Sequence, residues 1–171
     1  MKKGFTLAEV LITLGIIGVV VAMTMPSLIQ HYREKELITS YKRVYSILNQ
    51  TYLLLKDEYG NYEDWEQNDE DTYNKFKKYL KISADCPPGK SNSACIQTDI
   101  NYKDFAGNNI EKMIFNNAYS QPAIRLISGE SILFYSQGHS INFIVDLNGN
   151  TKPNQLGIDL QFFSFNIGKN Y

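Results

Sequence analysis

The 171-residue sequence predicts an α+β fold in which a long N-terminal helix packs on a small antiparallel sheet. Three observations lead to this prediction. Residues 5–29 are mostly apolar, 17 of 25, and hold a single charge. Apolar side chains at helical spacing then continue as far as Tyr59. The last third of the chain consists of short segments rich in β-branched and aromatic residues, separated by turns that contain glycine.

The apolar run at residues 5–29 is long enough to cross a membrane, since about 20 helical residues span a bilayer core of about 30 Å. Lys2 and Lys3 precede it, so the positive-inside rule places the N-terminus in the cytoplasm and the rest of the chain outside. A secretory signal peptide fits poorly, because the run is too long, carries Glu9 near its start and is followed by no Ala-x-Ala cleavage site. We therefore expect a membrane anchor.

The residues around the start of this run are the most specific signal in the chain. A short basic leader ends in Gly4 and is followed by Phe-Thr-Leu-Ala-Glu-Val-Leu-Ile. This segment resembles the type IV prepilin signal, which type IV pilins share with the pseudopilins of type II secretion and DNA-uptake machines. The resemblance implies that a prepilin peptidase cuts between Gly4 and Phe5 and methylates the new amino terminus. The family's glutamate, fifth after the cut, corresponds to Glu9, and its proline corresponds to Pro26.

The same resemblance implies a domain organisation and a set of partners. Residues 1–4 form the leader, 5–29 the transmembrane and polymerisation half of the helix, and 30–171 an exported pilin-like head that includes the outer half of the helix. The subunit crosses the inner (cytoplasmic) membrane once and later joins a filament. Its partners are membrane lipid, identical or related pilin-like subunits, prepilin peptidase and the inner-membrane assembly platform.

The function that the resemblance favours is a structural subunit of a type IV pilus-like filament, and a head without a long adhesive insertion favours a type II secretion pseudopilin. Two alternatives stay open. One is the pilin of a surface filament used in adhesion, twitching or DNA uptake. The other, from a different class, is a membrane-anchored exported binding domain that does not polymerise.

Glu9 supports a role in assembly on physical grounds. A carboxylate inside a membrane-spanning helix costs a few kcal/mol and calls for a cationic partner. The sequence has no basic residue between Lys3 and Arg33, so the cleaved chain supplies none nearby. The resemblance implies that the partner is the amino group of Phe5 on a neighbouring subunit. The alternative is an acid that reaches the membrane surface and has no partner.

Charge and apolar patterning predict a second, shorter helix and the outer half of the first helix. Six acids lie within residues 63–71, and lysines follow, which suits the dipole of a helix at residues 70–81. The acidic run is either a site for a partner or cation, or a solvated connection. The first helix should end before Gly60 and bury one face, formed by Leu37, Tyr41, Val44, Leu48, Tyr52, Leu55 and Tyr59.

Cys86 and Cys95 bracket a turn-rich segment in the exported part of the chain, a pattern that predicts a disulfide. A metal or a catalytic thiol fits less well, because His31 and His139 are distant in the sequence and no second pair of soft ligands exists.

We expect four strands, at residues 123–127, 131–135, 141–146 and 162–167, and an Asp- and Asn-rich loop before the last. Oxygen side chains on tight turns are typical of calcium sites, although the spacing differs from an EF-hand. The loop resembles a segment of pseudopilin-like proteins, and the resemblance implies calcium ligands at Asp146, Asn148 and Asp159. The alternative is a plain turn in which these side chains cap the backbone.

Composition and motifs argue against two other classes of function. The net charge of −1, with tyrosines that are not interleaved with lysines, does not suit contact with a nucleic acid. No nucleophile elbow, phosphate-binding glycine loop or zinc-protease motif is present, so we expect no enzymatic activity.

Overall fold

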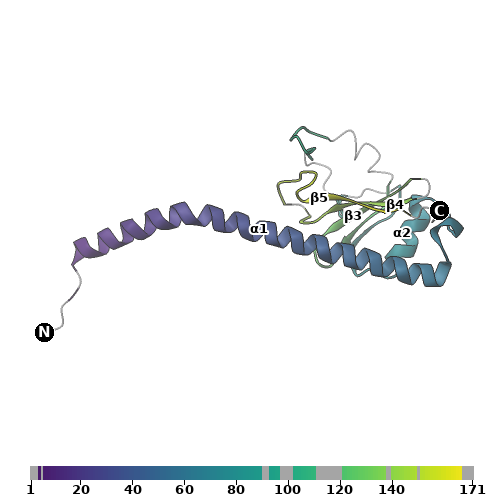
Figure 1. Ribbon diagram of the computed structural model, residues 1–171, viewed down its shortest axis with the longest axis horizontal. Helices are drawn as coiled ribbons and strands as arrows, with labels where there is room; N and C mark the ends of the chain where they lie inside the picture. Colours follow the sequence, from purple (N-terminus) through teal and green to yellow (C-terminus); the bar gives the residue numbers. More distant parts are fainter. Residues whose placement is uncertain are drawn as a thin grey trace. The chain divides into compact units, whose positions relative to one another are not determined.

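A computed structural model describes residues 4, 6–89, 93–96, 102–110, 121–137, 140–149 and 151–166 (Figure 1). The chain divides into two compact units, residues 1–38 and 39–171. One helix, α1 (Leu7–Tyr59), belongs to both. The other elements are a 3-10 turn (Tyr62–Asp64), α2 (Asp69–Lys77), β1 (Ile82–Cys86), β2 (Ala123–Leu126), β3 (Ser131–Gln137), β4 (Ser140–Asp146) and β5 (Leu160–Asn166).

In the first unit every helical residue from 7 to 36 is exposed. Among the described residues, α1 is the one helix whose length and apolar composition suffice to cross a membrane. Pro26 lies inside α1, which continues through it without a break. The predicted boundary at residue 29 marks where the helix leaves the lipid. Contacts within the chain do not test it, so it stays a prediction.

The second unit is the predicted α+β head, a long helix packed on an antiparallel sheet of five strands in the order β1-β2-β3-β4-β5. Helix α1 buries one face against it, formed by Ser40, Val44, Leu48, Thr51 and Leu55. Val44, Leu48 and Leu55 were predicted for this face and are fully buried. Tyr41, also predicted, is partly exposed because it lies at the edge of the sheet, where it stacks on Phe163.

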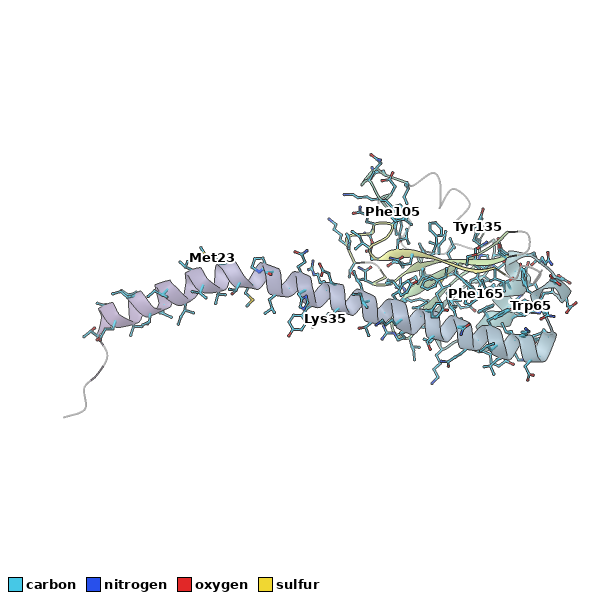
Figure 2. All side chains as sticks on the ribbon, viewed as in Figure 1. Met23, Lys35, Trp65, Phe105, Tyr135 and Phe165 are labelled. Carbon is cyan, nitrogen blue, oxygen red and sulfur yellow. A yellow bond between two sulfur atoms is a disulfide. The ribbon has the colours of Figure 1, made fainter. Side chains whose placement is uncertain are left out.

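Aromatic side chains fill the core between the helices and the sheet. Phe76 of α2 packs edge-on against Phe134 and Phe143, with ring centroids 6.0 and 5.1 Å away. Phe165 of β5, which is labelled in Figure 2, stacks on Tyr52 of α1 with ring centroids 5.6 Å apart. Large rings of this kind supply much of the apolar area that a head of this size can bury.

Two predictions about this unit need correction. The second helix runs from Asp69 to Lys77 rather than from residue 70 to 81, because the chain turns at residues 78–80 to begin β1. Strand β1 itself was not predicted. Its sequence, Ile-Ser-Ala-Asp-Cys, is too polar to suggest a strand, and it forms because antiparallel pairing with β2 satisfies its backbone. The four predicted strands are confirmed, with ends shifted by one or two residues.

Candidate functional site: the start of α1 and the loops of the head

The first turn of α1 contains the predicted assembly residue Glu9. The backbone N–H of Thr6 donates to Glu9 Oε2 at 2.8 Å, and the Thr6 hydroxyl donates to the same oxygen at 2.7 Å. The backbone N–H of Glu9 donates in return to Thr6 Oγ1 at 3.3 Å. This reciprocal arrangement is a capping box, which satisfies donors that the start of a helix otherwise leaves without partners.

The capping box gives the Glu9 carboxylate hydrogen-bond partners within its own chain. Inside a bilayer each polar group without a partner costs several kcal/mol, and Thr6 supplies two donors from the same subunit. The second oxygen, Oε1, accepts no hydrogen bond from the described residues. Glu9 therefore keeps acceptor capacity for a donor on another molecule. The Thr-x-x-Glu spacing that signals the box is visible in the sequence, and sequence reasoning overlooked it.

Phe5 lies outside the described residues, so cleavage between Gly4 and Phe5 stays a prediction. Gly4 is exposed. The roles predicted for Glu9 and Pro26 in contacts between subunits likewise stay predictions.

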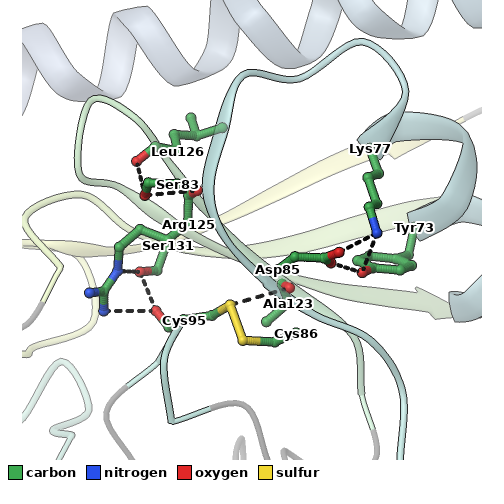
Figure 3. The surroundings of a disulfide bond; sticks show 10 residues. All are labelled: Tyr73, Lys77, Ser83, Asp85, Cys86, Cys95, Ala123, Arg125, Leu126 and Ser131. Atoms are coloured by element: carbon green, nitrogen blue, oxygen red, sulfur yellow. Dashed lines mark hydrogen bonds and ion pairs between the residues drawn. A yellow bond between two sulfur atoms is a disulfide. The ribbon is translucent and has the colours of Figure 1, made fainter. Parts of the chain in front are cut away.

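The predicted disulfide is present in the head (Figure 3). It joins Cys86, the last residue of β1, to Cys95, and both are buried. The carbonyl oxygen of Cys95 also accepts a hydrogen bond from Arg125 Nη2 at 3.1 Å and another from the hydroxyl of Ser131. The disulfide therefore holds residue 95 to β1, and the two polar contacts hold it against β2 and β3.

The loop between β4 and β5 contains the three residues predicted to bind calcium. Asp159 accepts the backbone N–H groups of Asn154 and Gln155, both at 2.6 Å. Asp146 accepts the backbone N–H of Asn148 at 3.3 Å and the hydroxyl of Tyr102 at 3.4 Å. Both carboxylates therefore cap turns of the loop, as the alternative interpretation of this segment expects.

The buried carboxylates and amide oxygens of this loop nevertheless favour a cation. Burial, together with the nearby charge of Asp159, raises the pKa of Asp146 to about 7. The side-chain oxygens of Asn148 and Asn154 are buried and accept no hydrogen bond from the described residues. Two carboxylates and amide oxygens suit calcium in kind. However, no group of three or more His, Cys, Asp and Glu side chains that could hold a metal occurs in the part of the chain that is described.

The acidic segment at residues 63–71 has structural contacts at its end. Asn68 caps α2 by accepting the backbone N–H of Asp71 at 2.7 Å. Asp69 accepts the backbone N–H of Ser136 on β3, and Asp71 pairs with Lys75 one turn along α2. Asp69 therefore fixes α2 to the sheet and Asp71 stabilises α2 itself, and neither role needs a partner molecule.

Comparison with known proteins adds two matches that together cover most of the chain. Residues 27–170 match a family described as a family of unknown function, DUF6613. The chain belongs to this family. Residues 1–25 match the prokaryotic N-terminal methylation motif, which marks a type IV pilin-like prepilin signal. No curated protein and no solved structure shows detectable similarity to the chain. The chain is thus a DUF6613 member that begins with a prepilin signal, and its apolar N-terminal helix fits a membrane-anchored subunit.

Proposed function

We propose that this chain is a structural subunit of a type IV pilus-like filament, specifically a pseudopilin of a type II secretion-type system. The observation that carries the proposal is the methylation motif at the start of a helix that is mostly apolar over residues 7–29 and exposed over residues 7–36. Prepilin peptidase cleaves and methylates the chain, and the assembly platform then extracts the subunit from the inner membrane.

The exposed helix supports polymerisation on physical grounds. An apolar surface of this length has to be covered, first by lipid and later by other subunits. Contacts that are repeated head to tail without closing a ring produce a helical filament. The same surface therefore serves as membrane anchor and as filament interior.

Glu9 gives this packing its register. Its carboxylate keeps one oxygen for a partner on another molecule, and the methylated amino group of Phe5 on the neighbouring subunit supplies a cation there. Pairing the two removes an uncompensated charge from an apolar environment, a gain of free energy that only the correctly aligned neighbour provides.

The pseudopilin role is distinguished from the alternatives by three measurements. Mass spectrometry of the mature protein should find Phe5 at the N-terminus with one added methyl group. An unprocessed, membrane-retained chain would instead indicate a binding domain that does not polymerise. Deletion of the gene should abolish export of a secreted enzyme without removing long surface filaments. Loss of surface filaments with normal secretion would favour the surface pilin.

We propose in addition that the loop between β4 and β5 binds calcium through Asp146, Asn148 and Asp159. Support comes from the raised pKa of the buried Asp146 carboxyl and from the buried Asn148 side-chain oxygen that accepts no hydrogen bond from the described residues. A divalent cation would relieve the repulsion between the two carboxylates.

A further inference from the structure

The head contains an apolar groove beside α1 that none of the functions above uses. Its volume is about 340 Å³. The groove lies between α1, the connection from α2 to β1, and the turn from β2 to β3. It is lined by Ile47, Gln50, Thr51 and Leu54 of α1, together with Lys81 and Ile127.

The groove leaves large apolar side chains in contact with water. Leu54 is 52% exposed and Ile127 is 65% exposed. The four lining residues of α1 recur at helical spacing, so the groove follows one face of the helix. Lys81 is the one lysine or arginine of its lining, and it forms no ion pair with the residues that the structure describes.

A second exposed apolar feature lies on another surface of the head. Phe105, at the tip of the loop formed by residues 102–110, is 73% exposed. Figure 2 shows it on the side of the sheet away from the part of α1 that the sheet covers. We call this loop the Phe105 turn.

The Phe105 turn is held in place by hydrogen bonds within itself and by hydrogen bonds to the β4–β5 loop. Asp104 accepts the backbone N–H of Asn108 at 2.8 Å and its side-chain amide at 3.0 Å. Lys103 exchanges backbone hydrogen bonds with the β4–β5 loop, donating to Asn154 and accepting from Leu156, each at 2.9 Å.

The ring of Phe105 itself rests on Gly157, where an added Cβ would lie 2.5 Å from ring atom Cε1. Rigid aromatic side chains presented in this way lose little conformational entropy on binding and act as interface anchors.

We propose that the Phe105 turn of one subunit docks into the groove of a neighbouring copy, with Phe105 against Leu54 and Ile127 and Asp104 beside Lys81. The contact rests on the proposed filament. Asn108 holds the pKa of Asp104 below its usual value, so Asp104 and Lys81 carry opposite charges at neutral pH.

The choice of a second copy as occupant follows from the arrangement of the two features. The groove and the Phe105 turn belong to one chain, expose apolar side chains beside the opposite charges of Lys81 and Asp104, and lie on different surfaces of the head. A contact between two different surfaces of identical subunits is heterologous, and it extends a filament when it does not close into a ring. It would link the heads in the same way that the apolar helices link the membrane halves.

Disulfide trapping in assembled filaments tests the contact with the full chain. The native cysteines are joined to each other, so the introduced thiols are free to report the contact. A chain with Phe105→Cys and Leu54→Cys should give a ladder of covalent oligomers on mild oxidation. The matched control carries Phe105→Cys with Leu53→Cys, since Leu53 is equally exposed on α1 but does not line the groove. The control should give no ladder.

The outcomes separate this inference from the proposed function. Filaments that form but give no ladder, or an equal ladder with the Leu53 control, overturn the contact and leave the filament intact. A wild-type chain that forms no filament overturns both.

A second measurement guards against cysteine variants that fail to assemble. Phe105→Ala should lower the yield of sheared filaments several-fold at unchanged subunit level, and Lys81→Glu should do the same. Phe162→Ala, which removes another exposed phenylalanine outside the turn, and Lys56→Glu should not. Equal losses in all four variants would overturn the contact.

Discussion

Arg43 of α1 binds the carboxylate of Glu130 in the turn between β2 and β3, where only 1% of the Glu130 side chain is exposed. Two guanidinium nitrogens donate to Glu130 Oε1, one of them at 2.8 Å, and the hydroxyl of Ser128 donates to the other oxygen. The second nitrogen also donates to Ser40 Oγ at 3.2 Å. The pair therefore fixes the position of the sheet along the helix.

Removing the cation should destabilise the head, because Glu130 would remain buried without a charged partner. We expect Arg43→Met, which keeps the apolar stem, to lower the free energy of unfolding by about 2–3 kcal/mol. The measurement is urea unfolding of the full chain in detergent. Lys78→Met, which removes an exposed pair with Glu58, is the matched control and should change little. The double variant Arg43→Met/Glu130→Gln should recover part of the loss, and its failure to do so would contradict the pairing argument.

Changes at Glu9 and Thr6 should separate the capping contact from the contact between subunits. Glu9→Ala should insert and lose its leader normally but should fail to enter filaments, because it cannot pair with a neighbouring amino group. Glu9→Gln keeps an acceptor for Thr6 and loses the charge, so it should assemble almost as poorly. The measurement compares processed subunit in membranes with subunit in sheared filaments. Normal incorporation of Glu9→Gln would contradict the charge pairing.

Thr6 should matter through Glu9 rather than by contact with a neighbour. Thr6→Val removes the hydroxyl that donates to Glu9 and accepts from its backbone, whereas Thr6→Ser keeps it. We expect Thr6→Val to reduce filament yield and Thr6→Ser to restore it. Equal behaviour of the two variants would show that the hydroxyl is not required.

The disulfide should stabilise the head by closing a short loop. Replacing both Cys86 and Cys95 with serine should lower the free energy of unfolding by about 2 kcal/mol. A reducing agent should destabilise the wild-type chain by a similar amount and leave the double variant unchanged. Because Cys95 also anchors Arg125 and Ser131, hydrogen exchange should also rise around Arg125 in β2 and Ser131 at the start of β3. Exchange confined to residue 95 would contradict that coupling.

Calcium binding should appear as thermal stabilisation of the chain in detergent. At a calcium concentration a hundredfold above the dissociation constant, the gain is about 2.7 kcal/mol, or a rise in Tm of roughly 5–10 °C. A chelator should reverse it, and Asp146→Asn should abolish it. Asp104→Asn, which alters a loop aspartate outside the proposed site, should retain it. Identical melting with calcium and with chelator would rule out the ion.

Alkaline titration should reveal the environment of Tyr73. Burial, together with its hydrogen bond to Asp85, raises the pKa of Tyr73 to about 12. The folded state therefore holds this proton more tightly than the unfolded state, so stability is full below pH 10 and falls as the pH rises through 12. The absorbance of tyrosinate should show a late step that Tyr73→Phe removes. A late step of unchanged size in Tyr73→Phe would contradict the assignment.

Local signals in the sequence were sufficient for much of the fold. The period of the apolar residues predicted the buried face of α1 at Val44, Leu48 and Leu55, and the two cysteines predicted their own pairing. The same reasoning failed at β1, whose five residues carry no strand pattern. Nothing local in the sequence indicates that Arg43 meets a carboxylate 87 residues later in the chain.

What the sequence determines by itself is therefore the part of this protein that acts through local chemistry: the prepilin signal, the apolar anchor with Glu9, and the period of the helix that follows. These depend on residues within a few turns of one another, and their physics needs no tertiary contact. Only the tertiary structure decides how β1, Glu130, the groove and the Phe105 turn are placed. Each depends on residues that are far apart in the chain and that burial and backbone pairing bring together. A local sequence pattern does not predict such contacts.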